Sequence, residues 1–154
     1  MKSNLKSLLF HILVPNMLAF TIQMLIPDYQ DYLNSLNQPF VLPSLVFIIV
    51  WPCLYTLMGI SAFLVEKENS DNVSHAMKYY YIQLFINLSY SVCFFYFHNL
   101  VLSTIITISL LVLSIVTFIK FYKINKLSAY LLIPYILWLI IANYLQIGIY
   151  FLNN

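Results

Sequence analysis

The sequence places three side chains that could bind a ligand, two indoles and one amide, deep inside long apolar stretches. Trp51, Asn87 and Trp138 each lie nine to eleven residues from one end of such a stretch. At the helical rise of about 1.5 Å per residue this is about 13–16 Å, near the middle of a membrane core roughly 30 Å thick. Tryptophan normally prefers the membrane interface, where its N–H meets water. At mid-depth the three side chains need partners inside the protein, which favours a shared pocket.

Four further side chains precede or follow these three by four or eight residues, which places them on the same helix faces. Two are amides, one is a phenol, and one is a small alanine that leaves space. Aromatic walls with a few hydrogen-bonding groups suit a flat, apolar, partly polar molecule. The predicted ligand-binding residues are Trp51, Tyr55, Gln83, Asn87, Trp138, Ala142 and Gln146.

The same spacing is also compatible with a purely structural role for these side chains. Polar side chains in membrane helices often only hold helices together, at about 0.6 kcal/mol each. We interpret His11 as a helix-contact or cytoplasmic-end residue, not a haem ligand, and His75 and His98 as loop residues. Cys53 and Cys93 are expected to be small buried side chains. No carboxylate pair, catalytic triad or metal cluster is evident, so we expect no conventional enzyme, no metal site and no required cofactor.

The elements that must position these residues are membrane helices. The chain is 62% hydrophobic and 8% charged, against about 45–50% and about 25% in a typical soluble domain. A net charge of +2 gives no reason to expect nucleic acid as a partner. Five stretches reach the length of about 20 residues that a spanning helix needs, which predicts an all-α bundle of five transmembrane helices in one domain, residues 1–154. The stretches are 8–26, 42–65, 76–97, 100–119 and 127–152.

The lysines predict the orientation of these spans. All seven lie at one side of the five-span arrangement, and the opposite side carries Asp28 and Asp31 but no Lys or Arg. The positive-inside rule then places the N-terminus in the cytoplasm and the C-terminus outside the cell membrane. The longest extracytoplasmic segment is 28–41, and the His98-Asn99 turn is so short that the helices on either side of it should be antiparallel neighbours.

The chain contains two long motifs. The first is a proline-containing segment followed by V-W-x-x-L-Y-x-x-M-G, and the second is A-x-L-L-x-P-Y-x-x-W-L-x-x-A-x-x-L. Between them, the third stretch carries Q-L-x-x-N and then F-F. Together these motifs resemble the TspO/MBR family of tryptophan-rich sensory and translocator proteins. The matching residues are Pro39, Pro43, Val50, Trp51, Leu54, Tyr55, Met58 and Gly59, then Gln83, Leu84, Asn87, Phe94 and Phe95, then Ala129, Leu131, Leu132, Pro134, Tyr135, Trp138, Leu139, Ala142 and Leu145.

The resemblance implies a five-helix bundle that binds protoporphyrin IX, other tetrapyrroles and apolar drug-like ligands in an intramembrane pocket lidded by the first extracytoplasmic loop. It implies a tetrapyrrole or stress sensor or regulator, surrounded by membrane lipid and often a homodimer. The alternatives that it leaves are a transporter of porphyrin or lipid, and a light- and oxygen-dependent porphyrin-degrading enzyme. In that last case Trp51 and Trp138 would be the catalytic residues.

The sequence also departs from the family pattern. Val41 stands where the family has a tryptophan, and Leu88 and Tyr90 replace a W-x-W pair in the third helix. Gln146 replaces an asparagine in the fifth helix, and Phe151 occupies part of the steroid-contact motif of animal members. We therefore do not expect sterol to bind at that motif.

Overall fold

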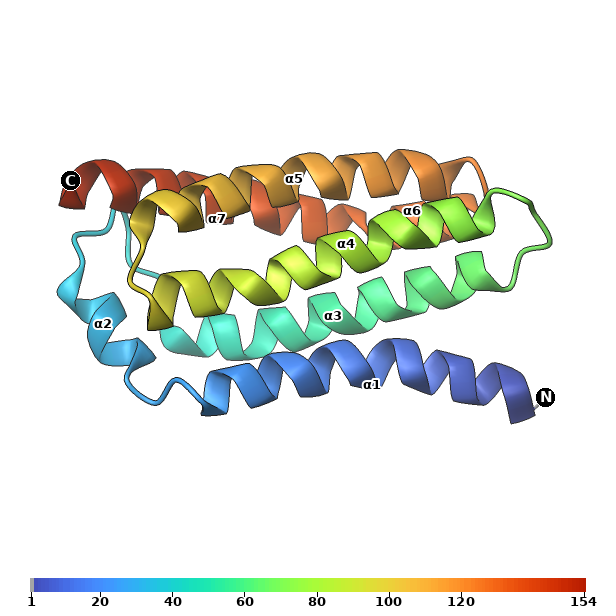
Figure 1. Cartoon of the computed structure of the whole chain (residues 1–154), viewed down its shortest axis with the longest axis horizontal. Coiled ribbons are helices and arrows are strands. Elements are labelled where there is room, and N and C mark those ends of the chain that lie inside the picture. The colour runs from blue at the N-terminus through green and yellow to red at the C-terminus, as the bar shows by residue number, and fades with distance from the viewer. Residues whose placement is uncertain (1) are drawn as a thin grey trace.

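The computed structural model describes residues 2–154, and every regular element in that range is helical. The predicted all-α class is confirmed. Long helices run side by side, and their direction alternates along the chain (Figure 1). The elements are α1 (Lys2–Met24), α2 (Tyr29–Ser35), α3 (Ser44–Glu66), α4 (Val73–Ser91), the π-helical turn η1 (Val92–Tyr96), α5 (Leu100–Tyr122), α6 (Lys126–Leu131) and α7 (Ile133–Asn153).

Polar residues set the starts of the later helices. Asn99 accepts a hydrogen bond from the backbone N–H of Leu102 at 2.9 Å and so caps α5. Asn125 caps α6 in the same way through the backbone N–H of Ser128, at 3.0 Å. A side-chain oxygen at this position satisfies an N–H that the helix itself leaves free. His98 turns the chain with φ of 51° and makes the short connection between η1 and α5, which are antiparallel neighbours as predicted.

Four helical segments of the described chain are long and apolar enough to cross a membrane: Asn4–Met24, Leu45–Glu66, Leu100–Tyr122 and Lys126–Asn153. They support a multi-pass membrane protein. The segment predicted as the third span is helical, but α4 also carries Lys78, Gln83 and Asn87 and is less apolar than the other four. Composition alone therefore does not establish five spans.

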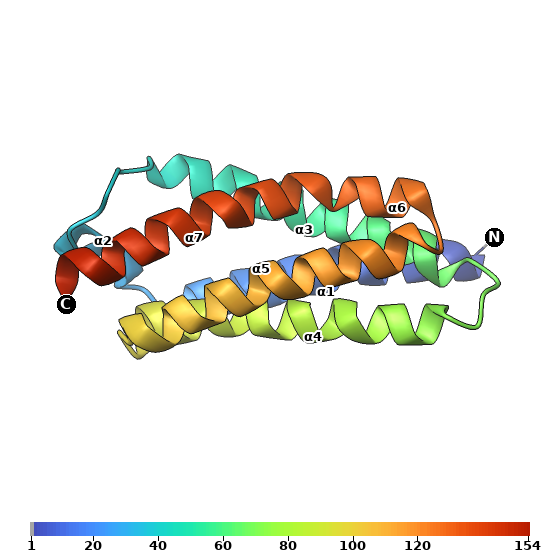
Figure 2. The same cartoon turned by 90° about the horizontal axis from the view of Figure 1, so that it is seen from above.

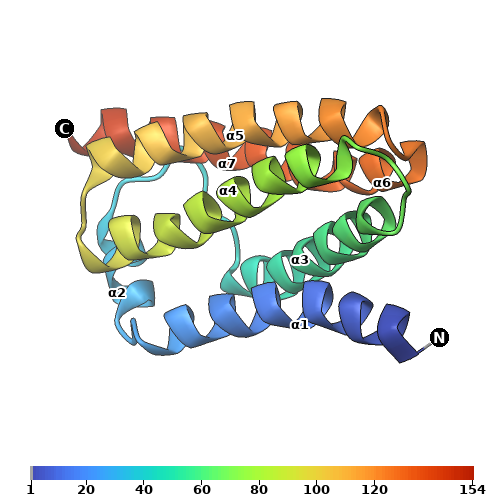
Figure 3. The same cartoon turned by 45° about the vertical axis from the view of Figure 1, so that its right-hand side comes forward.

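The helices pack around α3 and α5. Helix α1 lies along α3 on the outside of the bundle (Figure 1), while α5 packs against both α4 and α7 (Figure 2). Helix α3 contacts α6 closely and α7 only sparsely, so α3 and α7 diverge away from α6. At one end lie the N-terminus and the α3–α4 and α5–α6 connections, with the lysines that they carry; we call it the lysine end (Figure 3). At the opposite end, the α2 end, lie α2 and the C-terminus.

Small residues hold the lysine end together. Ser61 of α3 and Ser128 of α6 are fully buried, and each hydroxyl bonds the other residue's backbone carbonyl, at 2.8 and 2.9 Å. Gly59 lies against the backbone of α1, where an added Cβ would meet the carbonyl of His11. These contacts fix α3 against its neighbours in this half of the bundle.

Several sequence predictions need correction. His75 lies in the first turn of α4 and not in a loop, because α4 begins at Val73. Cys53 is exposed on the outside of α3 and Cys93 is only half-buried; both are free thiols. The segment 28–41 contains a helix, α2, that was not expected. His11 is 2% exposed between helices, which confirms it as a helix-contact residue, and His98 lies in a turn as expected.

Candidate functional site

Four aromatic side chains of α3 and α7 contact one another, and we call them the ring cluster. Phe47, Trp51 and Tyr55 follow one another at four-residue steps on α3, and Trp138 faces them from α7. Trp51 stacks on Tyr55 with ring centroids 5.6 Å apart. The Trp138 ring meets Trp51 edge-on at 6.4 Å and Phe47 edge-on at 6.0 Å. The two predicted indoles are therefore in contact, as a shared site requires.

A buried hydrogen-bond bridge lies directly beside this cluster. The Tyr55 hydroxyl donates to Oδ1 of Asn87 at 2.6 Å, and Nδ2 of Asn87 donates to the Tyr135 hydroxyl at 2.8 Å. The bridge joins α3, α4 and α7 through side chains that are at most 5% exposed. Tyr135 was missed as a site residue, although its place three residues before Trp138 puts it close to the same helix face.

Three buried polar atoms without a partner in the described chain belong to predicted site residues, while others, such as the Tyr80 hydroxyl and Oδ1 of Asn143, belong to residues outside the predicted site. Trp138 Nε1 is buried and bonds no described residue, and neither the oxygen nor the nitrogen of the Gln83 amide does so. Gln83 is fully buried one turn before Asn87 on α4. An unpaired polar group in a low-dielectric interior costs free energy, since it has lost water and gained no partner. A ligand with hydrogen-bonding groups would satisfy these atoms.

Gln146 belongs to a second polar cluster nearer the α2 end. Its Oε1 accepts from the Tyr90 hydroxyl at 2.7 Å, and its Nε2 donates to the Thr104 hydroxyl at 3.3 Å. Asn143, on the same helix, donates to the backbone carbonyl of Thr107 at 3.0 Å. These bonds tie α7 to α4 and α5 and account for the polar groups of Gln146 without a ligand.

The structure does not bring all seven predicted residues together. Trp51, Tyr55, Asn87 and Trp138 are connected to one another, Gln146 belongs to the separate polar cluster, and Gln83 bonds neither group. Ala142 is half-buried one turn beyond Trp138 on α7, between the ring cluster and the Gln146 bonds. Phe47 joins the ring cluster from α3 although it was not predicted; extending the four-residue step one turn before Trp51 would have found it.

The ring cluster also lies where two hydrophobic cores meet. Trp51, Tyr55 and Trp138 pack with the larger core, which reaches toward the lysine end, whereas Phe47 packs with a smaller core around Phe94, Leu145 and Ile149. Two open hollows of the described surface lie elsewhere, one on α4 near the lysine end and one on the outward face of α3. The rings of the cluster are in mutual contact, so a ligand between them would have to displace them.

The segment between α1 and α3 lies at the α2 end of the bundle and contacts the last turns of α7. The backbone N–H of Asn37 donates to Oδ1 of Asn153 at 2.9 Å, and Nδ2 of Asn153 donates to the Asn37 carbonyl at 2.8 Å. The ring of Pro39 lies against Gly148 of α7, at 2.5 Å from where a Cβ would stand. Tyr32 of α2 stacks on the ring of His98, in the turn before α5, with ring centroids 3.8 Å apart. The connection is therefore fastened at several points.

Nothing in the described part of the chain suggests a metal centre, since no three His, Cys, Asp or Glu residues gather there. A sequence profile of the TspO/MBR family matches residues 11–152, nearly the whole chain. The chain belongs to the TspO/MBR family.

Individual relatives agree with this TspO/MBR assignment. A tryptophan-rich protein TspO from Archaeoglobus fulgidus is 30% identical over 125 residues, which cover 80% of this chain and 81% of the relative. Protein CrtK from Rhodobacter capsulatus is 28% identical over 78% of this chain and 77% of its own. Human translocator protein 2 is 31% identical over 64% of this chain and 60% of its own.

Two of the residues expected to depart from the TspO/MBR pattern lie together in the structure. The Tyr90 hydroxyl donates to Oε1 of Gln146. The other two lie apart from this pair: Leu88 packs against the larger core, and Val41 is 75% exposed in the connection before α3.

Proposed function

We propose that this TspO/MBR protein binds a porphyrin, protoporphyrin IX or a similar flat apolar ligand, between α3 and α7, and acts as a tetrapyrrole sensor or regulator. The observation that supports this most is the contact between Trp51 and Trp138 next to a buried indole N–H without a partner. Large aromatic faces and a few unsatisfied polar groups are what such a ligand needs.

Each side chain has a distinct role in this proposal. Trp51 and Trp138 separate and stack on or edge the macrocycle. The Trp138 N–H and the Gln83 amide donate or accept hydrogen bonds at its polar groups. Asn87 already uses both amide atoms to bridge Tyr55 and Tyr135, so it holds the wall of the site in place and offers the ligand only its remaining N–H and lone pair. Ala142 keeps one side of the slot open because its side chain is small.

We propose five membrane spans: the four described above, and α4 together with η1, which is the third span along the chain. Their 24 residues, 73–96, would extend about 36 Å, enough to cross the core. The polar Gln83 and Asn87 are buried against neighbouring helices, whereas Ile82 and Phe85 are exposed on the outside. A membrane helix with its amides turned inward is still compatible with lipid. The lysine end then lies in the cytoplasm by the positive-inside rule.

Tryptophan fluorescence gives a direct test, because Trp51 and Trp138 are the only tryptophans in the chain. Protein in detergent is excited selectively at its indoles and titrated with protoporphyrin IX in the dark. Saturable quenching in the wild type, in Trp51→Phe and in Trp138→Phe would place the porphyrin near both indoles. Ala142→Phe should weaken binding about tenfold, since a ring at this position would overpack the site, at a typical cost of about 1–3 kcal/mol.

The control is Phe85→Ala, which removes a 71% exposed ring from the outside of α4 and should leave the titration unchanged. Equal affinity in Ala142→Phe and the wild type would reject the site. A parallel titration under light and oxygen tests for degradation. Loss of the porphyrin absorption bands that disappears in the Trp51→Phe, Trp138→Phe double variant would make the protein an enzyme instead of a sensor, and porphyrin flux into sealed liposomes would make it a transporter.

A further inference from the structure

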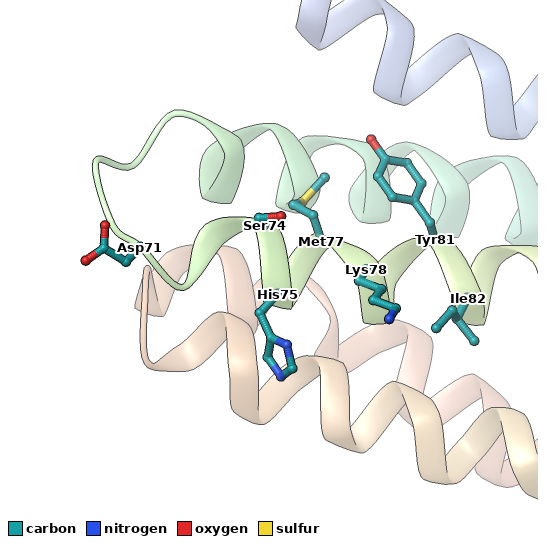
Figure 4. Close-up of a pocket in the computed structure, with 7 residues that line it drawn as sticks. All are labelled: Asp71, Ser74, His75, Met77, Lys78, Tyr81 and Ile82. Carbon is teal, nitrogen blue, oxygen red and sulfur yellow. The ribbon is translucent and has the colours of Figure 1, made fainter.

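A second, separate site is suggested by an open hollow on the outward face of α4 near the lysine end. Its lining residues recur at three- and four-residue steps and so form one stripe along the helix. In Figure 4, Met77 and Tyr81 point toward one edge of the helix, while His75 and Lys78 point toward the other. The hollow is lined by Asp71, Ser74, His75, Met77, Lys78, Tyr81 and Ile82, none of which belongs to the ring cluster.

The chemistry of the hollow changes with depth along α4. Ser74 and His75 lie in the first turn, and Lys78 lies about 7.5 Å from the start of the helix at Val73. Tyr81 and Ile82 lie about one turn deeper, at about 12–14 Å. Apart from Met77, polar and cationic groups therefore occupy the outer part, and aromatic and aliphatic groups occupy the inner part. This order matches a phospholipid, whose phosphate lies at the interface and whose acyl chains enter the core.

The walls of the hollow are held from behind by other helices. Met77 is 7% exposed and packs into the larger core. The Tyr81 ring stacks on His11 of α1 with centroids 6.3 Å apart and an interplanar angle of 26°. His11 in turn contacts Glu66, the last residue of α3, at 3.2 Å. The apolar side of the hollow is thus a preformed surface and not a set of free side chains.

The charges of the hollow are free to meet a ligand. Within the described chain, neither Lys78 nor Asp71, which lies at the outer end of the hollow, forms an ion pair. A lysine amino group binds phosphate as a point charge, and the Ser74 hydroxyl offers a second donor. Asp71 repels a bare phosphate, but its carboxylate accepts hydrogen bonds from a head group that carries hydroxyls.

We propose that this hollow binds an anionic glycerophospholipid with a hydroxylated head group. Its phosphate lies at Lys78 and Ser74, its hydroxyls lie toward Asp71, and its glycerol and first acyl carbons lie against Tyr81 and Ile82. The lysine end carries the excess of positive charge, and anionic lipids are attracted to such a face. This site rests on α4 as a membrane span, as proposed above, but its occupancy does not depend on porphyrin binding.

Native mass spectrometry tests the proposal on the full chain in detergent, with phosphatidylglycerol and phosphatidylcholine as probes. The wild type should retain phosphatidylglycerol in preference to phosphatidylcholine. Lys78→Gln should lower the phosphatidylglycerol affinity about fivefold, the size expected for one lysine at an anionic membrane surface. Lys123→Gln removes the same charge from the exposed α5–α6 connection, outside the hollow, and should have no effect.

Two further arms separate a lipid from a free phosphate. Ile82→Asn changes only the apolar part of the hollow, so it should weaken phosphatidylglycerol binding, and glycerol phosphate should not displace the lipid. Displacement by glycerol phosphate would show recognition of a free phosphate and overturn the lipid assignment. No lipid preference in the wild type, or equal losses in Lys78→Gln and Lys123→Gln, would overturn the site. Lys78 is exposed, and far-ultraviolet circular dichroism should confirm that both lysine variants keep the wild-type helix content.

Discussion

Replacing Asn87 with leucine should destabilise the bundle by an amount that can be bounded from its contacts. Leucine has the same number of side-chain heavy atoms as asparagine and the same branching at Cγ, so the change creates no large cavity. It leaves the hydroxyls of Tyr55 and Tyr135 without the partners that they have at 2.6 and 2.8 Å. A buried unpaired group costs about 1–3 kcal/mol in protein interiors, while polar contacts in membrane helices average about 0.6 kcal/mol each.

Two lost contacts therefore correspond to about 1–6 kcal/mol. For a chain of this length, 1 kcal/mol shifts the midpoint of thermal unfolding by about 2–4 °C, so we expect a decrease of at least about 2 °C. The assay is thermal unfolding in detergent, followed by circular dichroism. The control is the triple variant Tyr55→Phe, Asn87→Leu, Tyr135→Phe, in which no polar group is orphaned and much of the lost stability should return.

The result that would refute this reasoning is a triple variant as unstable as Asn87→Leu alone. The loss would then come from packing and not from the hydrogen bonds. An unchanged midpoint in Asn87→Leu would contradict the bridge itself. Either outcome would also weaken the assignment of Asn87 as a residue that holds the wall of the site.

Three other changes probe other parts of the fold. Gly59→Ala should lower stability by about 1–3 kcal/mol in the same assay, since its Cβ meets backbone atoms of α1 that can move only with the whole helix; unchanged stability would show that α1 is loosely held. Tyr90→Phe should lower the midpoint by a few degrees because Oε1 of Gln146 loses its donor, whereas Tyr90→Phe combined with Gln146→Leu should recover part of the loss. Asn153→Ala should speed amide hydrogen exchange in the segment 28–43 and leave the exchange in α5 unchanged, because it removes both hydrogen bonds to Asn37. If the segment 28–43 exchanges at the same rate in the variant and the wild type, the Asn37–Asn153 bonds do not hold it in place.

Much of the helical layout could be predicted from composition because a membrane leaves few alternatives. Backbone groups in lipid must bond within their own segment, so each long apolar stretch becomes a helix. The bounds were off by a few residues, as in α3, which runs from Ser44 to Glu66 instead of 42–65. The break between α6 and α7 at Leu132 was not anticipated, although Pro134, at the start of α7, marks it.

Interactions across the α2 end could not be predicted in the same way. Helix α2 has seven residues, too few to show a period, and it is held by tertiary contacts such as the Tyr32–His98 stack. The single-turn π-helix η1 likewise has no signature in composition. The indole contact was predictable because the depth of a residue within a span follows directly from its position along the chain. Which tyrosine completes the Asn87 bridge depends on helix rotation, which the spacing alone does not fix.

The geometry of α3 connects the proposed ligand site to the outer connection. Trp51 contacts both Tyr55 and Trp138, so a macrocycle between α3 and α7 must push these rings apart. The lysine half of α3 resists such a movement, because its contacts with α1 and α6 are made through backbone atoms and buried hydroxyls. The half that begins at Ser44 packs only sparsely on α7 and follows directly from the fastened segment. Ligand binding would therefore move this half of α3 and strain the Asn37–Asn153 pair, and a sensor could report occupancy through that change at the membrane surface.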